Sequence, residues 1–272
     1  MAHILPARAS ESPHAASNPD YRRPGPVSMS VTNGELKFGS GRNLDYSRFQ
    51  PAHREADVLV VVGHGFLRDK DRMAGLARHI ATWGLDVATL DFRHSRIWAG
   101  HHDQNAADMV ALARHLNAKR VIYAGFSAGG LSALLAAASD PAAIGYLGLD
   151  TVDDGSGAQA AANLPFGIWA LVSSPAVCNA QGNALQVYAA AKVPARVMLV
   201  TDASHCHFEF PRDPLCALLC GRGEQRNSRQ EIQSSILGLV TASVLYQAGM
   251  ATDARSWWSG HGVVSATLVK CD

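Results

Sequence analysis

The segment Gly125–Gly130 reads GFSAGG and has the spacing of a nucleophilic serine on a tight turn. The G-x-S-x-G pattern supports this chemistry when a buried strand precedes it and a helix follows. Both neighbours are expected, since residues 120–124 resemble a short apolar strand and residues 131–138 favour a helix. Glycines at these positions avoid side chains that would clash in the turn. We therefore expect Ser127 to be a nucleophile, and a glycine-rich turn without chemistry is the alternative.

A second segment, HGF at His64–Phe66, follows the apolar run of residues 57–63. In enzymes with such an elbow, two backbone N–H groups hold the developing oxyanion: one after the nucleophile and one from a loop at this position. The expected donors are the N–H groups of Ala128 and Phe66. The His64 side chain either orients this loop by a hydrogen bond or contributes to the substrate pocket.

A serine nucleophile also needs a histidine base, which follows the serine and the acid in the chain. The strand expected over residues 195–201 leads into the segment DASHCH, which contains His205 and His207. His261 lies beyond the last expected helix and is the weaker candidate. A zinc site formed by His205, Cys206 and His207 is the alternative, but no second pair of ligands accompanies it. Neither a metal nor an organic cofactor is expected.

The acid must hold the imidazole in the correct tautomer and stabilise its cation. The apolar run of residues 168–172 is not followed by a carboxylate, whereas the run of residues 144–149 ends at Asp150. Asp150 is therefore the first candidate for the acid and Asp153 the second. Asp150 could instead only cap a loop or a helix.

The elements that must position these residues follow from alternating apolar runs and helical periodicity. Strands are expected over residues 57–63, 86–90, 120–124, 144–149, 168–172 and 195–201, and helices over residues 73–83, 106–116, 131–138 and 227–248. This alternation predicts an α/β fold with a mostly parallel central sheet flanked by helices.

The N-terminal part has a different pattern. Residues 27–32 and 35–38 are expected to form an antiparallel hairpin, because Asn33-Gly34 between them is a turn signal. Residues 1–26 are expected to be a tail, disordered or strapped down or the remnant of an export signal. Residues 27–272 are expected to form a single domain, because no linker or internal repeat divides them.

Composition excludes several classes of protein. Of the 272 residues, 47% are hydrophobic and 17% charged, with 24 basic against 23 acidic residues. Nucleic-acid binding is disfavoured because the chain lacks a basic excess, and a disordered chain is disfavoured because its apolar content is high. No apolar run is long enough for a membrane span. A monomer is expected.

The cysteines and the N-terminus bear on the compartment. The chain has five cysteines without a C-x-x-C pair, and Ala7-Arg8-Ala9 resembles the end of an export signal. A secreted or periplasmic protein with one or two disulfides is expected, and a cytoplasmic protein with reduced thiols is the alternative.

With these residues placed, the chain resembles the α/β-hydrolase superfamily. More narrowly, it resembles chlorophyllase-like and poly(ethylene terephthalate)-hydrolase-like (cutinase-like) serine esterases. The resemblance covers roughly residues 55–210 and rests on the segments Gly63–Leu67, His79–Val87, Gly125–Gly130, Leu149–Asp153 and Ser204–Cys206. Two departures leave the substrate open: Phe126 replaces the histidine or tryptophan of many relatives, and Cys206–Cys220 contains three cysteines.

The resemblance implies a serine carboxylic-ester hydrolase that forms an acyl-enzyme without a cofactor. It implies His205 rather than His207 as the base, and it supports Asp150 as the acid. Short acyl esters or polyesters are the expected substrates, and Trp98 and Trp169 are weak candidates for the walls of an acyl pocket. Chlorophyllase, acyltransferase or amidase activity on the same fold is the second hypothesis. A non-catalytic binding protein of the same fold is the third.

Overall fold

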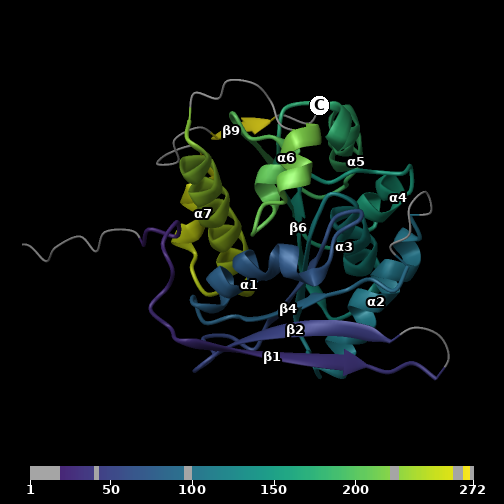
Figure 1. Cartoon of the computed structure of the whole chain (residues 1–272), viewed down its shortest axis with the longest axis vertical. Helices are drawn as coiled ribbons and strands as arrows, with labels where there is room; N and C mark the ends of the chain where they lie inside the picture. Colours follow the sequence, from purple (N-terminus) through teal and green to yellow (C-terminus); the bar gives the residue numbers. More distant parts are fainter. Residues whose placement is uncertain (1–18, 40–42, 95–99, 221–226, 260–265, 270–272) are drawn as a thin grey trace, which may run out of the picture.

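A nine-stranded mixed sheet organises the protein (Figure 1). The computed structural model describes residues 19–39, 43–94, 100–220, 227–259 and 266–269. The strand order is β1-β2-β4-β3-β5-β6-β7-β8-β9. The strands from β4 to β8 in this order are parallel, whereas β1, β2 and β9 run antiparallel to their neighbours. The predicted α/β class, with a sheet that is parallel in its core, is confirmed.

The strands are short, from four residues in β9 to eight in β1 and β2. Their bounds are β1 Met29–Leu36, β2 Leu44–Pro51, β3 Leu59–Gly63, β4 Asp86–Leu90, β5 Val121–Phe126, β6 Ala143–Leu149, β7 Ile168–Val172, β8 Ala195–Val200 and β9 Ala266–Val269.

Helices cover both faces of the sheet (Figure 1). Helices α1 (Ala74–Ala81) and α7 (Arg229–Ala248) pack on one face. The other face carries α2 (His102–His115), α3 (Ala128–Ser139), α4 (Gly157–Ala162) and α5 (Ala184–Ala189). A further helix, α6 (Pro214–Cys220), follows the loop after β8, and four short 3-10 helices are η1 Lys70–Met73, η2 Val177–Gly182, η3 His205–Phe208 and η4 Asp253–Ser259.

The central strands are apolar on both faces because both faces are covered. In β3, Val60 and Val62 face α1 and α7, whereas Leu59 and Val61 face the opposite helices. All five β3 residues are buried, which is why this strand reads as a continuous run of valines.

The register of the parallel strands brings chemically useful residues to one edge of the sheet. Gly63 of β3 pairs with Gly125 of β5, and Phe126 of β5 pairs with Leu149 of β6. Ser127 and Asp150 therefore each follow directly after a paired residue. The carboxyl ends of these strands form the edge where the candidate site lies.

The N-terminal antiparallel hairpin exists, but its predicted turn at Asn33-Gly34 is wrong. Both residues lie inside β1, and the partner strand is β2. The Ser47 hydroxyl donates to Asn33 Oδ1 at 2.8 Å, and a Cβ atom on Gly34 would lie 2.3 Å from the Tyr46 ring. Neighbours on the opposite strand β2 therefore account for Asn33 and Gly34. A local turn signal carries no information about such contacts between strands.

Residues 19–26 of the expected tail are packed on the domain, whereas residues 1–18 lie outside the described part. Tyr21 is buried, and its ring lies 4.9 Å from that of Trp83 and 5.3 Å from that of Trp257, centroid to centroid. The His79 ring nitrogen Nε2 bonds to the Tyr21 carbonyl at 2.9 Å. This segment is therefore strapped to α1 and η4.

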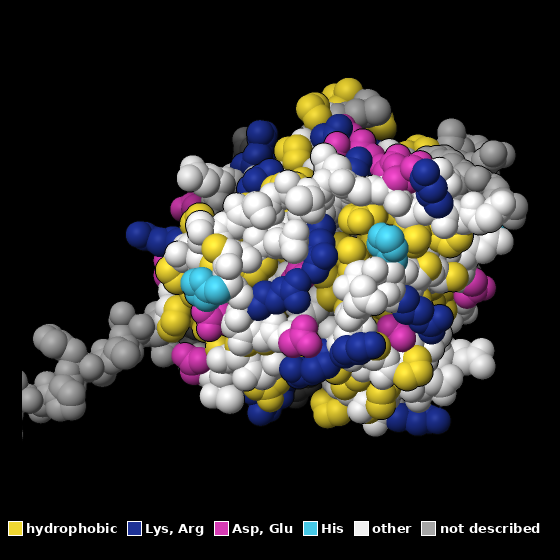
Figure 2. All heavy atoms as spheres, turned by 90° about the horizontal axis from the view of Figure 1, so that it is seen from below, with side chains coloured by type: hydrophobic (Ala, Val, Ile, Leu, Met, Phe, Trp, Pro, Cys, Tyr) yellow, Lys and Arg dark blue, Asp and Glu magenta, His cyan; other side chains and the backbone are white. Residues whose placement is uncertain are grey.

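The surface shows mixed charge on the face that β1 and β2 occupy. Lys and Arg side chains are interspersed with Asp and Glu there (Figure 2), as expected for a formal net charge of +1. In the described ranges, no helix combines the length and apolar character needed to cross a bilayer.

Replacing Tyr21 with alanine tests whether the N-terminal strap is part of the core. We expect Tyr21→Ala to lower the free energy of unfolding by about 3 kcal/mol, as for other buried aromatic side chains. Arg23→Ala removes an exposed side chain of the same segment and is expected to change it by less than about 0.5 kcal/mol. Urea unfolding followed by circular dichroism measures both, and equal midpoints for the two variants would contradict the packing.

Candidate active site

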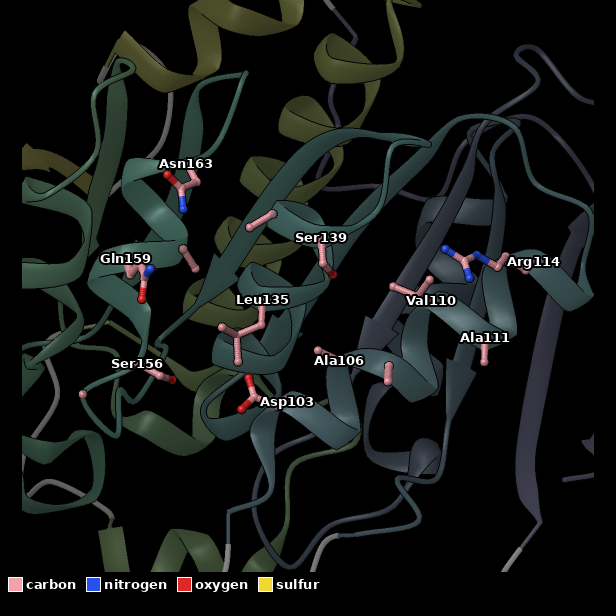
Figure 3. A pocket seen from close by; sticks show the side chains of 14 residues that line it. Asp103, Ala106, Val110, Ala111, Arg114, Leu135, Ser139, Ser156, Gln159 and Asn163 are labelled. Atoms are coloured by element: carbon pink, nitrogen blue, oxygen red, sulfur yellow. The ribbon is translucent and has the colours of Figure 1, made fainter. Parts of the chain in front are cut away.

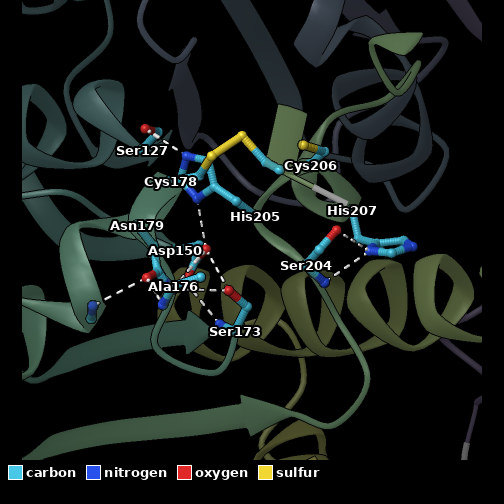
Figure 4. Close-up of polar contacts among 12 residues, drawn as sticks. Ser127, Asp150, Ser173, Ala176, Cys178, Asn179, Ser204, His205, Cys206 and His207 are labelled. Atoms are coloured by element: carbon cyan, nitrogen blue, oxygen red, sulfur yellow. Dashed lines mark hydrogen bonds and ion pairs between the residues drawn. A yellow bond between two sulfur atoms is a disulfide. The ribbon is translucent and has the colours of Figure 1, made fainter. Parts of the chain in front are cut away.

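Three strand ends bring Ser127, Asp150 and His205 into one hydrogen-bonded chain (Figure 4). His205 Nε2 lies 2.9 Å from Ser127 Oγ, and its Nδ1 lies 2.7 Å from Asp150 Oδ2. An ionised carboxylate can only accept, so Nδ1 carries the proton and Nε2 is left to accept from the serine hydroxyl. This arrangement can take the hydroxyl proton as the serine attacks an electrophile.

The serine occupies the tight turn between β5 and α3. Its backbone angles are φ 54° and ψ −122°, a conformation that costs roughly 1–3 kcal/mol for a residue with a side chain. Backbone hydrogen bonds hold it, since Ser127 N–H donates to Leu149 at 2.9 Å and the Ser127 carbonyl accepts from Gly130 and Val152. The surrounding sheet therefore fixes the direction of the hydroxyl.

The glycines of the turn are needed for close backbone approach. A Cβ atom on Gly125 would lie 2.1 Å from the Gly129 carbonyl oxygen, and one on Gly129 would lie 2.3 Å from the His64 carbonyl oxygen. These contacts let α3 begin directly against β5 and against the loop after β3.

The buried carboxylate of Asp150 is oriented by the segment that follows β7. Ser173 donates to it twice, from its N–H to Oδ1 at 2.8 Å and from its hydroxyl to Oδ2 at 2.7 Å. The Asn179 amide lies 3.4 Å from Oδ1 and 3.0 Å from the Ser173 hydroxyl. Sequence reasoning missed both residues, although the polar run after residues 168–172 was a signal that this strand end contributes to the site.

The other candidate acid has a different contact. The Asp153 carboxylate accepts from the Gly157 N–H at 2.8 Å, at the first residue of α4. Asp150 is thus the carboxylate that contacts the histidine, whereas the Asp153 carboxylate binds the first N–H group of α4.

The other candidate histidines do not reach the serine. His207 Nδ1 accepts from the Ser204 N–H at 2.9 Å, and burial, helped by the positive charge of Arg212, lowers the pKa of His207 to about 4. Cys206 is bonded to Cys216, so it offers no thiolate for the alternative zinc site. His261 lies outside the described residues.

The two expected oxyanion donors flank the serine. A Cβ atom on Gly65 would lie 3.3 Å from Ser127 Cβ, so the loop that leads to Phe66 runs alongside the nucleophile. Ala128 is the first residue of α3, where helical N–H groups have no partner within the helix. Within the described part of the chain, neither N–H donates a hydrogen bond. Both are therefore available to an oxyanion.

The buried His64 side chain holds this loop through both of its ring nitrogens, as the first interpretation of its side chain predicts. Its Nε2 accepts from the Phe92 N–H at 3.2 Å, so the proton on Nδ1 donates to the Gly65 carbonyl at 2.7 Å. Burial lowers the pKa of His64, so the neutral ring that this bonding requires is favoured.

Trp169, another candidate for the substrate pocket, is buried in the core. It pairs with Leu147 in the sheet, two positions before the end of β6, and its ring packs edge-on against Trp258 at 4.8 Å. The side chain is buried in the core under α7, because the strand reaches the site only after Val172. The other pocket candidate, Trp98, lies outside the described residues.

Phe126, the departure from the family pattern, lies beneath the histidine. Its ring centroid is 4.7 Å from that of His205, and the side chain is buried. An apolar ring at this position supports the imidazole from the sheet side.

Two disulfides tie α6 to both sides of the site. Cys206, next to His205, bonds to Cys216, and Cys178, next to Asn179, bonds to Cys220. Cross-links of this kind restrict the unfolded chain and hold irregular loops in place.

A separate hollow of about 750 Å³ opens between α2, α3 and α4 (Figure 3). Its walls include Arg114, Leu135 and Asn163, and no member of the hydrogen-bonded chain lines it. The hollow is therefore distinct from the candidate active site.

Comparison with known proteins identifies no relative: no family model and no curated protein matches the sequence.

The low pKa of His207 predicts a stability change with pH. An unfolded histidine takes up a proton near pH 6.5, whereas folded His207 does so near pH 4. The unfolded state thus binds more protons between these values, so His207 contributes stability above pH 6.5 that is lost as the pH falls toward 4, by roughly 2 kcal/mol.

His207→Asn keeps an acceptor for the Ser204 N–H and removes the titration, so its free energy of unfolding should fall less steeply over this range. Urea unfolding at successive pH values measures the difference from the wild type, and His53→Asn, at an exposed position, serves as control. Parallel curves for wild type and His207→Asn would contradict the assignment.

Proposed function

We propose that the protein is a serine carboxylic-ester hydrolase of the α/β-hydrolase type. The observation that carries the proposal is the chain from Asp150 through His205 to Ser127, with the serine on a strained elbow. The position of each residue after its strand and the order of the strands support the resemblance to the α/β-hydrolase superfamily.

The proposed reaction follows serine acyl transfer. Ser127 Oγ attacks the ester carbonyl carbon while His205 Nε2 takes its proton, and Asp150 stabilises the imidazolium. The Phe66 and Ala128 N–H groups hold the oxyanion. As the intermediate collapses, the C–O bond breaks, His205 protonates the leaving alcohol, and the acyl group stays on Ser127. Water then attacks the acyl carbon while His205 takes its proton, the bond to Ser127 Oγ breaks, and His205 returns the proton to Oγ as the carboxylic acid leaves.

Exposed apolar side chains around the site support an apolar ester as the substrate. Leu67 follows the expected oxyanion donor, and Val177 lies in the segment that holds the acid. Leu218 and Leu219 lie on α6, which the Cys178–Cys220 disulfide ties to that same segment. Among the described residues, the one further exposed large hydrophobic side chain is Val31, which is 37% exposed against 56–85% for these four. We therefore propose short acyl esters or polyesters as substrates.

The two disulfides support a secreted or periplasmic location, since such bonds persist in oxidising compartments. Cys271, the fifth cysteine, lies outside the described residues.

Ser127→Ala tests the proposal directly. Because the three residues act as a unit, we expect this change to lower kcat on a chromogenic short-chain ester by about 10⁴-fold or more. Ser139→Ala, at an exposed position at the end of α3, should keep the wild-type rate. Hydrolysis by Ser127→Ala at the wild-type rate would contradict the proposal.

A substrate panel separates esterase activity from other reactions of this fold. An ester hydrolase should cleave p-nitrophenyl esters and leave the matched anilides intact, whereas an amidase cleaves both. Transfer of the acyl group to an added alcohol in preference to water indicates an acyltransferase, and cleavage confined to bulky-alcohol esters indicates chlorophyllase-type specificity.

A further inference from the structure

One buried ion pair joins the oxyanion loop to the segment that carries the histidine. Arg68 lies two residues after Phe66, and its Nε donates to Glu209 Oε1 at 2.5 Å. Glu209 lies four residues after His205, and its side chain is completely buried. This ion pair therefore links the loop of the expected oxyanion donor to the segment of the expected base, next to a backbone hydrogen bond from the Phe210 N–H to the Arg72 carbonyl at 2.7 Å.

The carboxylate of Glu209 is fixed from other sides as well. Its second oxygen accepts from the Asp213 N–H at 3.1 Å, just before α6. The backbone carbonyl of Glu209 accepts from the Gln233 side chain of α7 at 3.2 Å. Glu209 is therefore held in place by α7 and by the residue before α6, and the position of the Arg68 side chain depends on its contact with Glu209.

The turn next to Arg68 is strained and needs support. Leu67 has a φ of 56°, in the left-handed region that a leucine disfavours, and its side chain is exposed. The Arg68 guanidinium also donates from Nη1 to the Leu67 carbonyl at 3.3 Å. The Arg68 side chain therefore bonds both to the carbonyl of the strained residue Leu67 and to the buried Glu209 carboxylate.

We infer that Arg68 and Glu209 are positioning residues that hold the Leu67 turn so that the Phe66 N–H points at the oxyanion. This inference rests on the proposed function. The guanidinium itself touches no reacting atom. It fixes the backbone that carries the Phe66 N–H, the group that contacts the oxyanion. Loss of the pair leaves the chain from Asp150 to Ser127 in place and removes stabilisation of the tetrahedral intermediate.

The test replaces both charges at once, because a single replacement leaves a buried charge without its partner and the protein could fail to fold. Arg68→Met with Glu209→Met is compared with Arg48→Met with Asp86→Met. The control pair is also buried, with side chains 20% and 5% exposed against 16% and 0%. It joins β2 to the first residue of β4, whereas Arg68 lies in the loop after β3.

Active sites are counted with a fluorophosphonate so that unfolded molecules do not enter the rate. For the Arg68/Glu209 variant we expect kcat per active site to fall about 100-fold, the effect of losing one oxyanion donor, with KM changed less than about twofold. The Ki of an alkyl trifluoromethyl ketone, which forms an oxyanion on the serine, should rise by a similar factor. The control pair should change neither value.

Wild-type kcat and Ki in the folded Arg68/Glu209 variant would overturn the inference and leave the proposed function intact. If the methionine variant does not fold, Arg68→Gln with Glu209→Gln is measured in the same way. A wild-type protein that neither reacts with the fluorophosphonate nor hydrolyses esters would overturn the proposed function, and the inference with it.

Discussion

The hydrogen bond between His205 and Asp150 is the contact on which the site depends, because it joins loops that are 55 residues apart in the chain. Ser127 and His205 are 78 residues apart. Such distances close only if the parallel strands keep their register, since a shift by one residue would turn every side chain of a strand to the opposite face. The apolar faces of the central strands, packed under helices on both sides, resist such a shift.

The loops at the carboxyl edge lack this support and are held by individual contacts. The segment after β8 carries His205, and the Cys206–Cys216 disulfide cross-links it to α6. The acid is held by two hydrogen bonds from Ser173. These contacts fix the geometry that the proposed acyl transfer needs, since small displacements of reacting groups are costly.

Local patterns in the sequence predicted the parts of the site that depend on local geometry. The glycines around Ser127 mark a turn that only certain residues can form, and Asp150 marks the end of an apolar run. Contacts between distant segments leave no such pattern. Ser173 looks like any loop serine until the fold places it against Asp150.

The wrong turn prediction has the same cause. Asn33-Gly34 carries a local turn signal, but the pairing with β2 across the hairpin decides its conformation. Trp169 likewise lies in a predicted strand, but only its packing under α7 shows that its side chain belongs to the core. Sequence period gives the faces of an element, and only packing decides which face meets the site.

The proposed function requires that His205 activates Ser127. The most direct measurement is labelling of the folded protein by a fluorophosphonate, with the modified peptide mapped by mass spectrometry. We expect a single adduct on Ser127 that is lost in His205→Ala, while circular dichroism shows that the variant is folded. An unlabelled Ser127 in folded wild-type protein, or equal labelling in His205→Ala, would contradict it.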